Sequence, residues 1–340
     1  MTSDATNDHA APTLAGPDPD SATFVYDEFS MFADNCREVG IALPADISVS
    51  RISFALQRPG GNGRSLSALR WGPGPVQLVL VHGGAQNAHT WDTTALALHG
   101  HGFRNILCID LPGHGHSDWS TDHRYEPGSM ADDLAEVIGA LAPSAAAVVG
   151  MSLGGMTVLA LSDAHPGLVR KLVMVDVTPG VNALKAKAVT DFVRGPQSFG
   201  SFSSLLARTK EHNATRTESS LRRGILHNAH RDTDGNWSWN YDRGLSEAMP
   251  QSSAEPNAPT TTQGQLIERF NPMWDIYDRL TMPLFMLRGA LSPVVDDTDI
   301  AEVLRRRPDA KVAVIEDAGH SIQGDQPVVL ARHLADYLAD

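Results

Sequence analysis

The stretch AAAVVGMSLGGMTVLALSDAH, residues 145–165, places Gly150-Met-Ser-Leu-Gly154 between an apolar run typical of a β-strand and a segment with helical spacing. G-x-S-x-G at a sharp strand-to-helix turn is the nucleophile-elbow pattern. Glycines two residues on either side of Ser152 are needed because side chains there would collide with the neighbouring strand or helix. The turn also places Ser152 at a helix N-terminus, where free N–H groups favour an oxyanion. The sequence therefore predicts that Ser152 is a nucleophile.

Alternating strands and helices surround this turn. The apolar runs that predict strands are Val76–Val81, Asn105–Asp110, Ala145–Val149, Lys171–Asp176, Pro283–Arg288 and Lys311–Ile315. The helical patterns are Thr90–Leu98, Ser129–Leu141, Leu153–Ala164, Thr298–Arg306 and Val328–Leu338. A predicted antiparallel hairpin, Arg51–Gln57 and Ser65–Trp71, precedes them around the glycine-rich turn 59–63. This order predicts an α/β fold with a mostly parallel sheet covered by helices on both faces.

Four motifs resemble those of the α/β-hydrolase fold superfamily. They are LVHGG at residues 80–84, DLPGHGHS at 110–117, GMSLGG at 150–155 and AGHS at 318–321. The motifs occur in the superfamily's order and span roughly residues 50–340. The resemblance implies a serine hydrolase with a cap domain, similar to esterases, lactonases or carbon–carbon bond hydrolases. A serine at the elbow argues against haloalkane dehalogenase or epoxide hydrolase chemistry, for which this fold uses an aspartate nucleophile.

Ser152 requires a general base, because a hydroxyl is a poor nucleophile until its proton is removed. His320 is the predicted base. It follows an apolar strand near the C-terminus, where the superfamily places its histidine. His82, His114 and His116 lie in turns near the same predicted edge of the sheet. We interpret these three histidines as structural residues that anchor turns and loops.

The third member of the triad is where this sequence departs from the superfamily's usual pattern. Most members carry an acid just after the strand that corresponds to Pro283–Arg288, but this chain has Ser292 there. Asp176 is the predicted acid, because some branches of the superfamily draw the acid from that strand end and a triad is defined by geometry. An aspartate at this position can also serve only to anchor the following loop. Asp296 and Asp297 are the competing acids, although both suit the start of a helix.

An oxyanion hole requires two N–H donors directed at the developing charge. The main-chain N–H of Leu153, directly after the nucleophile, is the first predicted donor. The second is predicted at Gly84, which follows the His82-Gly83 pair in the loop after a strand. A glycine at that position allows the backbone to approach a ligand closely, although it also suits a simple turn.

The alternation of predicted strands and helices stops between Asp176 and Pro283. Residues 177–282 contain amphipathic stretches and a Pro/Ser/Thr-rich part at 250–263. We predict a helical cap over the site, with 250–263 as a mobile loop. The predicted organisation is a disordered extension of residues 1–22, an α/β-hydrolase core of 23–176 and 283–340, and a helical cap of 177–282.

Apolar and aromatic residues of the predicted cap are candidates for a substrate pocket. The candidate substrate-binding residues are Trp237, Trp274 and Met273. Residues of this kind more often pack a cap onto its core, and that alternative stays open. Basic residues also gather in the cap, where a solvated helix face is their usual explanation.

Composition limits the class of partner. Acidic residues outnumber basic ones, 40 against 27, which gives a formal net charge of −13 and disfavours nucleic acid and anionic membranes as partners. The two cysteines, Cys36 and Cys108, indicate no disulfide framework and favour a reducing, cytoplasmic location. The sequence contains no P-loop, dinucleotide fingerprint or metal-ligand cluster, so we expect neither cofactor nor metal.

The predicted function is hydrolysis of a small to medium, hydrophobic carboxylic ester or lactone by a serine hydrolase. Ser152 attacks the carbonyl carbon, His320 acts as the base, and water releases the acid from the acyl-enzyme. One alternative is carbon–carbon bond hydrolysis of a β-diketone with a similar triad. A second alternative, from a different class, is a ligand-binding protein without catalytic activity.

Overall fold

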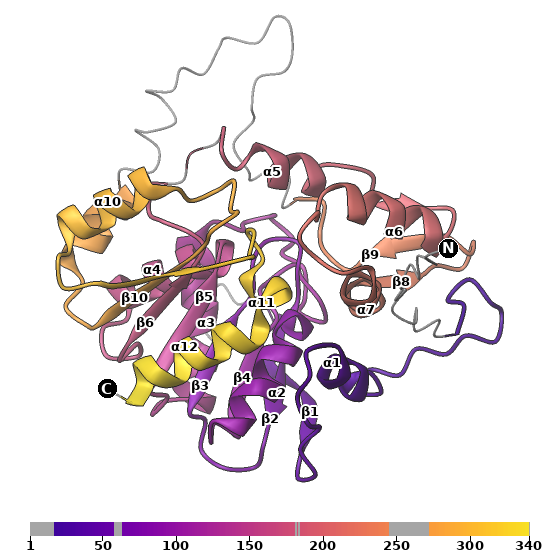
Figure 1. Cartoon of the computed structure of the whole chain (residues 1–340), viewed down its shortest axis with the longest axis horizontal. Helices are drawn as coiled ribbons and strands as arrows, with labels where there is room; N and C mark the ends of the chain where they lie inside the picture. Colours follow the sequence, from indigo (N-terminus) through magenta and orange to yellow (C-terminus); the bar gives the residue numbers. More distant parts are fainter. Residues whose placement is uncertain (1–16, 58–62, 181, 183, 245–271, 340) are drawn as a thin grey trace, which may run out of the picture.

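The computed structural model describes residues 17–57, 63–180, 182, 184–244 and 272–339, and an eight-stranded sheet runs through it (Figure 1). In spatial order the strands are β1 (Val49–Ala55), β2 (Ser65–Trp71), β4 (Ile106–Ile109), β3 (Leu78–Val81), β5 (Ala147–Met151), β6 (Leu172–Val175), β10 (Leu284–Gly289) and β11 (Lys311–Ile315). The β1–β2 and β2–β4 pairs are antiparallel, and every other neighbouring pair in this sheet is parallel. The predicted hairpin leading into a mostly parallel sheet is therefore confirmed.

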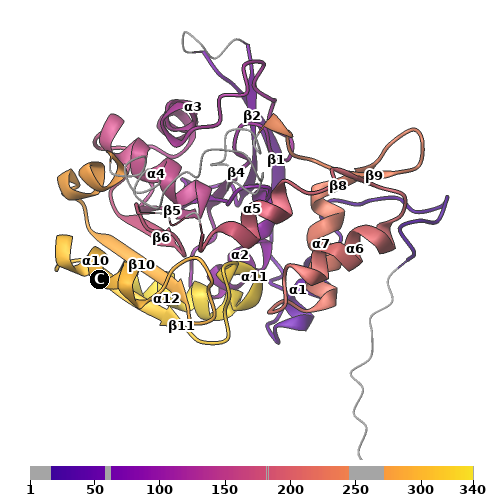
Figure 2. The same ribbon diagram turned by 90° about the horizontal axis from the view of Figure 1, so that it is seen from above.

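Helices cover both faces of the sheet (Figure 2). Successive side chains of a strand point to opposite faces, so Val79 and Val81 of β3 join one apolar cluster while Leu78 and Leu80 join another. The first cluster includes residues of α3 (Pro127–Leu141), α4 (Leu153–Ala164) and α10 (Asp297–Arg306). The second includes residues of α1 (Phe32–Glu38), α2 (Asp92–Gly100), α11 (Ile322–Asp325) and α12 (Pro327–Ala339). All four residues of β3 are buried, as continuous apolar runs predict for a doubly covered sheet.

Element boundaries differ from the sequence prediction by a few residues. The helix predicted from Thr90 begins at Asp92, because Ala88–Trp91 forms a short 3₁₀ helix, η1, at its start. The Asn87 side chain accepts a hydrogen bond from the N–H of His89 and caps this turn. The short helices α1 and α11 were not predicted, because segments of seven and four residues carry little helical periodicity.

Residues 177–282, between β6 and β10, form an insertion that is not purely helical. Its described part contains α5 (Lys187–Val193), β7 (Ser198–Phe199), α6 (Phe202–Glu211), α7 (Glu218–Asn228), β8 (Ala229–Arg231), β9 (Trp237–Trp239) and a helical stretch at 272–279. The three short strands form a separate antiparallel sheet in the order β7-β9-β8. The insertion predicted as a helical cap therefore holds a small sheet beside its helices, and the predicted loop 250–263 lies outside the described residues.

The end of the predicted disordered extension is held against the insertion. Residues 1–16 lie outside the described residues, whereas 17–22 are described. The Asp20 carboxylate accepts hydrogen bonds from the main-chain N–H of Phe202 at 2.9 Å and from Nε1 of Trp237 at 2.9 Å. The expectation of disorder is therefore corrected for residues 17–22. Among the described helices, none combines the length and apolar character needed to cross a membrane.

Candidate active site

Ser152 occupies the turn between β5 and α4, as the opening motif predicts. Its backbone has φ 50° and ψ −118°, a conformation that residues with a side chain rarely adopt. A Cβ atom on Gly150 would lie 2.6 Å from the carbonyl oxygen of Gly154, and one on Gly154 would lie 2.4 Å from that of His82. The predicted steric need for both glycines is confirmed.

The structure brings Ser152, His320 and Asp176 together from three loops. Nε2 of His320 lies 3.1 Å from Oγ of Ser152, and Nδ1 of His320 lies 2.7 Å from Oδ2 of Asp176. His320 lies in the loop between β11 and α11, and Asp176 directly follows β6. The Asp176 carboxylate is completely buried, whereas the imidazole is 14% exposed and open to the site. A continuous hydrogen-bonded chain therefore links the serine hydroxyl to a buried carboxylate.

The Asp176 carboxylate is held by two further donors from the turn after β10. The main-chain N–H of Gly289 donates to Oδ1 at 2.9 Å, and the hydroxyl of Ser292 donates to Oδ2 at 2.5 Å. The Ser292 oxygen itself accepts from the N–H groups of Val294 and Val295, so its proton is directed at Asp176. Sequence reasoning recognised Ser292 as the replacement for an acid but missed this contact. The donor capacity of a serine hydroxyl was the available signal.

The competing acids Asp296 and Asp297 have other partners. Asp296 caps α10 and forms an ion pair with Lys185 at 2.7 Å. The Asp297 side chain is 97% exposed and pairs with Arg288. The expectation that both suit the start of a helix is confirmed, and it is Asp176 whose carboxylate contacts the imidazole of His320.

The turn histidines hold loops together. Nε2 of His82 accepts from the N–H of Leu111 at 2.9 Å, and Nε2 of His114 accepts from that of Ala85 at 3.0 Å. Burial lowers the pKa of both rings, and for His114 the nearby His82 adds to this and brings the pKa to about 3. Both rings are therefore neutral acceptors at pH 7. The N–H of His116 donates to the Asp110 carboxylate, so this residue too belongs to a structural turn.

Comparison with known proteins agrees with this geometry. The model of the alpha/beta hydrolase fold family matches residues 77–327. The chain belongs to this family. The esterase Rv0045c of Mycobacterium tuberculosis is 38% identical over 311 residues, which cover 89% of this chain and 93% of that protein. A solved structure of Rv0045c has a TM-score of 0.74 and 37% identity, covering 92% of this chain and 99% of that one.

A more distant relative and a further solved structure also carry the name hydrolase. The 3-hydroxybutyrate-oligomer hydrolase of Cupriavidus necator is 26% identical over 271 residues, covering 77% of this chain and 88% of that protein. The structure of an E-2-(acetamidomethylene)succinate hydrolase has a TM-score of 0.71 at 21% identity, covering 86% of this chain and all of the other. The second likeness concerns the fold alone.

In this α/β hydrolase, Ser152 and His320 open into a cavity of about 390 Å³ between the core and the insertion. Apolar lining residues from the insertion are Val189, Phe192, Val193, Leu221, Ile225 and Trp239. The predicted residues Trp237, Trp274 and Met273 are not among those that line it, which corrects their assignment. Trp237 packs on Phe202 and bonds Asp20, Trp274 packs against Tyr277 and Arg306, and Met273 packs on the main core. Their packing role follows the alternative left open by the sequence.

The two predicted oxyanion donors belong to segments next to the cavity that Ser152 lines. Leu153 is the first residue of α4, and the first N–H groups of a helix have no partner within it. Gly84 lines the cavity together with Gly83. The N–H of Gly83 is engaged by the Gln86 side chain, which leaves Gly84 as the next main-chain donor along this loop. This placement suits the two predicted donors.

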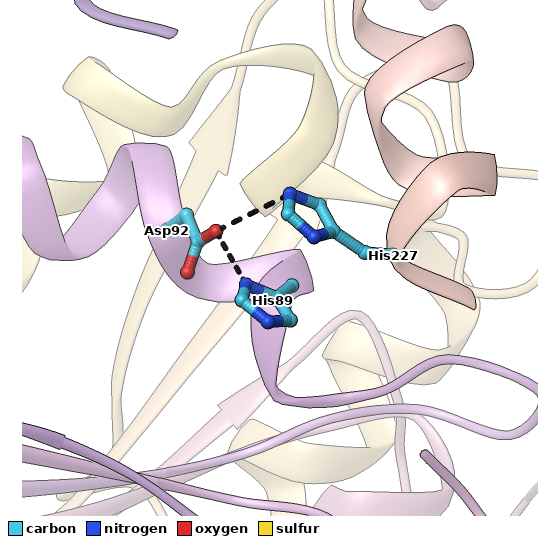
Figure 3. Close-up of side chains that lie close together, drawn as sticks. All are labelled: His89, Asp92 and His227. Carbon is cyan, nitrogen blue, oxygen red and sulfur yellow. Dashed lines mark hydrogen bonds and ion pairs between the residues drawn. The ribbon is translucent and has the colours of Figure 1, made fainter. Parts of the chain in front are cut away.

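A second polar cluster, formed by His89, Asp92 and His227, lies close to the same cavity, and the two histidines line it (Figure 3). The three side chains are buried, and their nitrogen and oxygen atoms are close enough to hold a metal ion. The sequence prediction found no metal-ligand cluster, because His227 lies on α7, far along the chain from η1 and α2. That expectation is corrected for these three residues.

Proposed function

We propose that this protein is a serine hydrolase that cleaves carboxylic esters through an acyl-enzyme on Ser152. The observation that carries the proposal is the hydrogen-bonded chain from Ser152 through His320 to the buried Asp176 carboxylate, at the wall of a cavity. Nucleophile, base and orienting carboxylate stand in the order that acyl transfer requires.

In the first half of the reaction, Oγ of Ser152 attacks the ester carbonyl carbon while Nε2 of His320 takes the hydroxyl proton. Asp176 holds the imidazole through Nδ1 and stabilises the cation that forms. The N–H groups of Leu153 and Gly84 bind the oxyanion, at about 3–4 kcal/mol each by analogy with deletions of single donors. His320 then protonates the leaving alkoxide, and the alcohol departs.

Water completes the cycle. His320 removes a proton from a water molecule, the hydroxide attacks the acyl carbon, and the Ser152 oxygen leaves with the proton held by His320. The products are a carboxylic acid and the free enzyme. Every step uses the chain, the ester and water.

The insertion serves as a cap that shapes the substrate pocket. Its apolar residues form one wall of the cavity that Ser152 and His320 face. Phe192 and Trp239 pack edge to face at 5.9 Å, which gives that wall an aromatic surface. A cavity of about 390 Å³ suits a small to medium hydrophobic ester or lactone. The names esterase and hydroxybutyrate-oligomer hydrolase among the relatives support this class.

Two buried, unpaired cysteines, Cys36 and Cys108, support a cytoplasmic location, where thiols stay reduced.

The test is labelling by a fluorophosphonate probe together with turnover of short p-nitrophenyl esters. Wild type is expected to be labelled on Ser152 and to turn over the esters, and Ser152→Ala to lose both. Ser162→Ala is the matched control, because Ser162 is buried in α4 and donates a hydrogen bond to the carbonyl of Val158. Failure of wild type to be labelled or to cleave any ester, lactone or β-diketone would favour the binding-protein alternative. Turnover of diketones alone would favour carbon–carbon bond hydrolysis.

A further inference from the structure

His89, Asp92 and His227 converge from the core and the insertion (Figure 3). His89 lies in η1, Asp92 begins α2, and His227 lies near the end of α7. Oδ2 of Asp92 is 2.7 Å from Nδ1 of His89 and 3.7 Å from Nε2 of His227. One ligand atom from each residue falls within 4.8 Å of the others, and the two rings stack at 3.9 Å. Three ligand atoms of three buried side chains therefore face a common point.

Two atoms of this cluster have no hydrogen-bond partner. They are Nε2 of His227 and Oδ1 of Asp92, and the side chains that carry them are 4% and 2% exposed. A buried polar atom without a partner is destabilising, by about 1–3 kcal/mol, and calls for an explanation. Figure 3 shows the unpartnered nitrogen of His227 directed at the Asp92 carboxylate, beyond hydrogen-bond distance. An ion bound between this nitrogen and the Asp92 carboxylate would give the nitrogen a partner.

The far side of each imidazole is already held by a polar group. Nε2 of His89 lies 3.0 Å from Oε1 of Glu28, and Nδ1 of His227 lies 2.7 Å from the hydroxyl of Tyr26. Histidines that bind metals almost always engage their second nitrogen with a carboxylate or another polar group, which orients the ring and fixes its tautomer. With the far nitrogens so engaged, Nε2 of His227 is left without a partner and Nδ1 of His89 faces Oδ2 of Asp92, so both can act as ligands once the proton between His89 and Asp92 is released.

The charge around the cluster favours a cation. Three carboxylates gather here, those of Glu28, Asp92 and Asp110, together with the guanidinium of Arg51. Arg51 pairs with Glu28 at 2.5 Å and with Asp110 at 2.7 Å, and one of its nitrogens also lies 3.1 Å from Nε2 of His89. Even with the His89 imidazole protonated, the three carboxylates outnumber the positive charges of Arg51 and His89, so the group keeps an excess of negative charge in a buried place, where such charge is costly. A divalent cation compensates it.

We propose that Nδ1 of His89, Oδ2 of Asp92 and Nε2 of His227 bind a divalent transition metal ion of the Zn²⁺ class. Two imidazoles and one carboxylate suit Zn²⁺ and its neighbours, whereas Ca²⁺ and Mg²⁺ prefer oxygen ligands. The ion takes the place of the proton between His89 and Asp92, which is released to solvent. Ligand distances near 2.0–2.1 Å then require His227 to move towards Asp92.

Occupancy of this site ties the insertion to the core. The ion enters from the cavity, because His89 and His227 both line it. It links the end of α7 to the start of α2, where the amide of Asn87 already donates to the carbonyl of His227 at 2.8 Å. The fourth coordination position faces water or a ligand in the cavity.

The test measures Zn²⁺ binding to the full-length chain after treatment with a chelator. Affinity and stoichiometry are read by competition with a chromophoric zinc chelator, and Co²⁺ absorption reports the coordination. We expect one high-affinity ion per chain in wild type and at least tenfold weaker binding in His227→Gln. His165→Gln is the matched control, because His165 forms an exposed pair with Asp132 at 3.0 Å and should leave binding unchanged. His320→Gln should also retain the high-affinity ion.

Tyr26→Phe keeps all three ligands and removes only the tyrosine hydroxyl that contacts Nδ1 of His227. It is therefore informative even where His227→Gln does not fold. Its zinc affinity should fall about 10-fold, at the low end of what loss of an outer partner costs. Unchanged affinity in a folded His227→Gln or in Tyr26→Phe would overturn the proposal. So would the absence of high-affinity binding in wild type, or its loss in His320→Gln alone, which would place the ion at the triad.

Discussion

The hydroxyl of Ser292 donates a hydrogen bond to the carboxylate of Asp176, with 2.5 Å between Oγ and Oδ2. Strands β6 and β10 are parallel neighbours, so the loops that carry these two residues leave the same edge of the sheet side by side. Ser292 stands where most members of the family carry their acid, and Asp176 supplies the carboxylate from the adjacent strand. In the proposed triad the carboxylate therefore comes from the neighbouring strand, and Ser292 donates a hydrogen bond to it.

Replacement of Asp176 by Asn should lower kcat on p-nitrophenyl esters by about 10⁴-fold. A neutral amide cannot stabilise the imidazolium of His320, and it favours the wrong tautomer of that ring. Steady-state kinetics on purified, folded enzyme measures this. Asp297→Asn is the matched control, because that carboxylate is 97% exposed and bound to Arg288, and its kcat should stay at the wild-type value. Near-normal turnover in Asp176→Asn would remove Asp176 from the mechanism.

Replacement of Ser292 by Ala should lower kcat by roughly tenfold with KM nearly unchanged, since one hydrogen bond to a charged group contributes about 1.5 kcal/mol. Ser292 acts here as a positioning residue, through Asp176 and not on the substrate. Ser292→Thr keeps the hydroxyl and should recover most of the activity. An equal loss in both variants, or a change in KM alone, would contradict the positioning role.

Replacement of Gly154 by Ala should destabilise the fold by about 3 kcal/mol. The added Cβ would lie 2.4 Å from the main-chain oxygen of His82, and the backbone there cannot move aside as the end of a flexible side chain can. Thermal unfolding followed by circular dichroism measures the loss. Gly139→Ala is the control: Gly139 lies within α3, its Cβ would have ordinary contact at 4.0 Å, and the variant should be up to about 1 kcal/mol more stable. Equal stability of the two variants would refute the steric argument at the elbow.

Stability of the metal-free chain should fall on the alkaline side of neutrality. Burial works to lower the pKa of His89, but the charge of Asp92 and hydrogen bonds to Asp92 and Glu28 raise it to about 9. Because the folded pKa lies above the unfolded value near 6.5, the stabilisation is complete below about pH 6.5 and is lost as pH rises through about 9. The contribution is on the order of 3 kcal/mol.

Denaturant unfolding at pH 7 and pH 10, with a chelator present, measures this loss. His89→Gln lacks the titrating ring, so its stability should change less between the two pH values than that of wild type. Parallel pH curves for wild type and His89→Gln would show that this ring does not carry the alkaline loss.

Most of the fold could be read from local patterns. Strands buried on both faces require unbroken apolar runs, and five of the six predicted runs correspond to such strands, β3, β4, β5, β6 and β10. The sixth run corresponds to the edge strand β11, where Val314 is 43% exposed. The insertion was harder, because β8 and β9 are three residues each and their strand character depends on pairing with each other. A polar run with two tryptophans carries no periodicity that distinguishes such a hairpin from a loop.

The residues of the cavity wall illustrate the same limit. Trp237 and Trp239 are two residues apart on β9, so the alternation of side chains places both on one face of the strand, at different points along it. Trp239 lines the cavity and Trp237 bonds Asp20 from the N-terminal segment. Composition alone cannot decide which tryptophan faces the substrate, because that depends on how the small sheet sits on the core.

The sequence by itself predicted the nucleophile and the base and determined the sheet that carries them, because steric demands at the elbow and burial of both sheet faces leave a direct signature in neighbouring residues. Tertiary structure alone decided that Ser292 holds the Asp176 carboxylate and that His89, Asp92 and His227 meet. These contacts join segments far apart in the chain. They depend on the order of the strands and on how the insertion packs against the core, and no local sequence pattern encodes either.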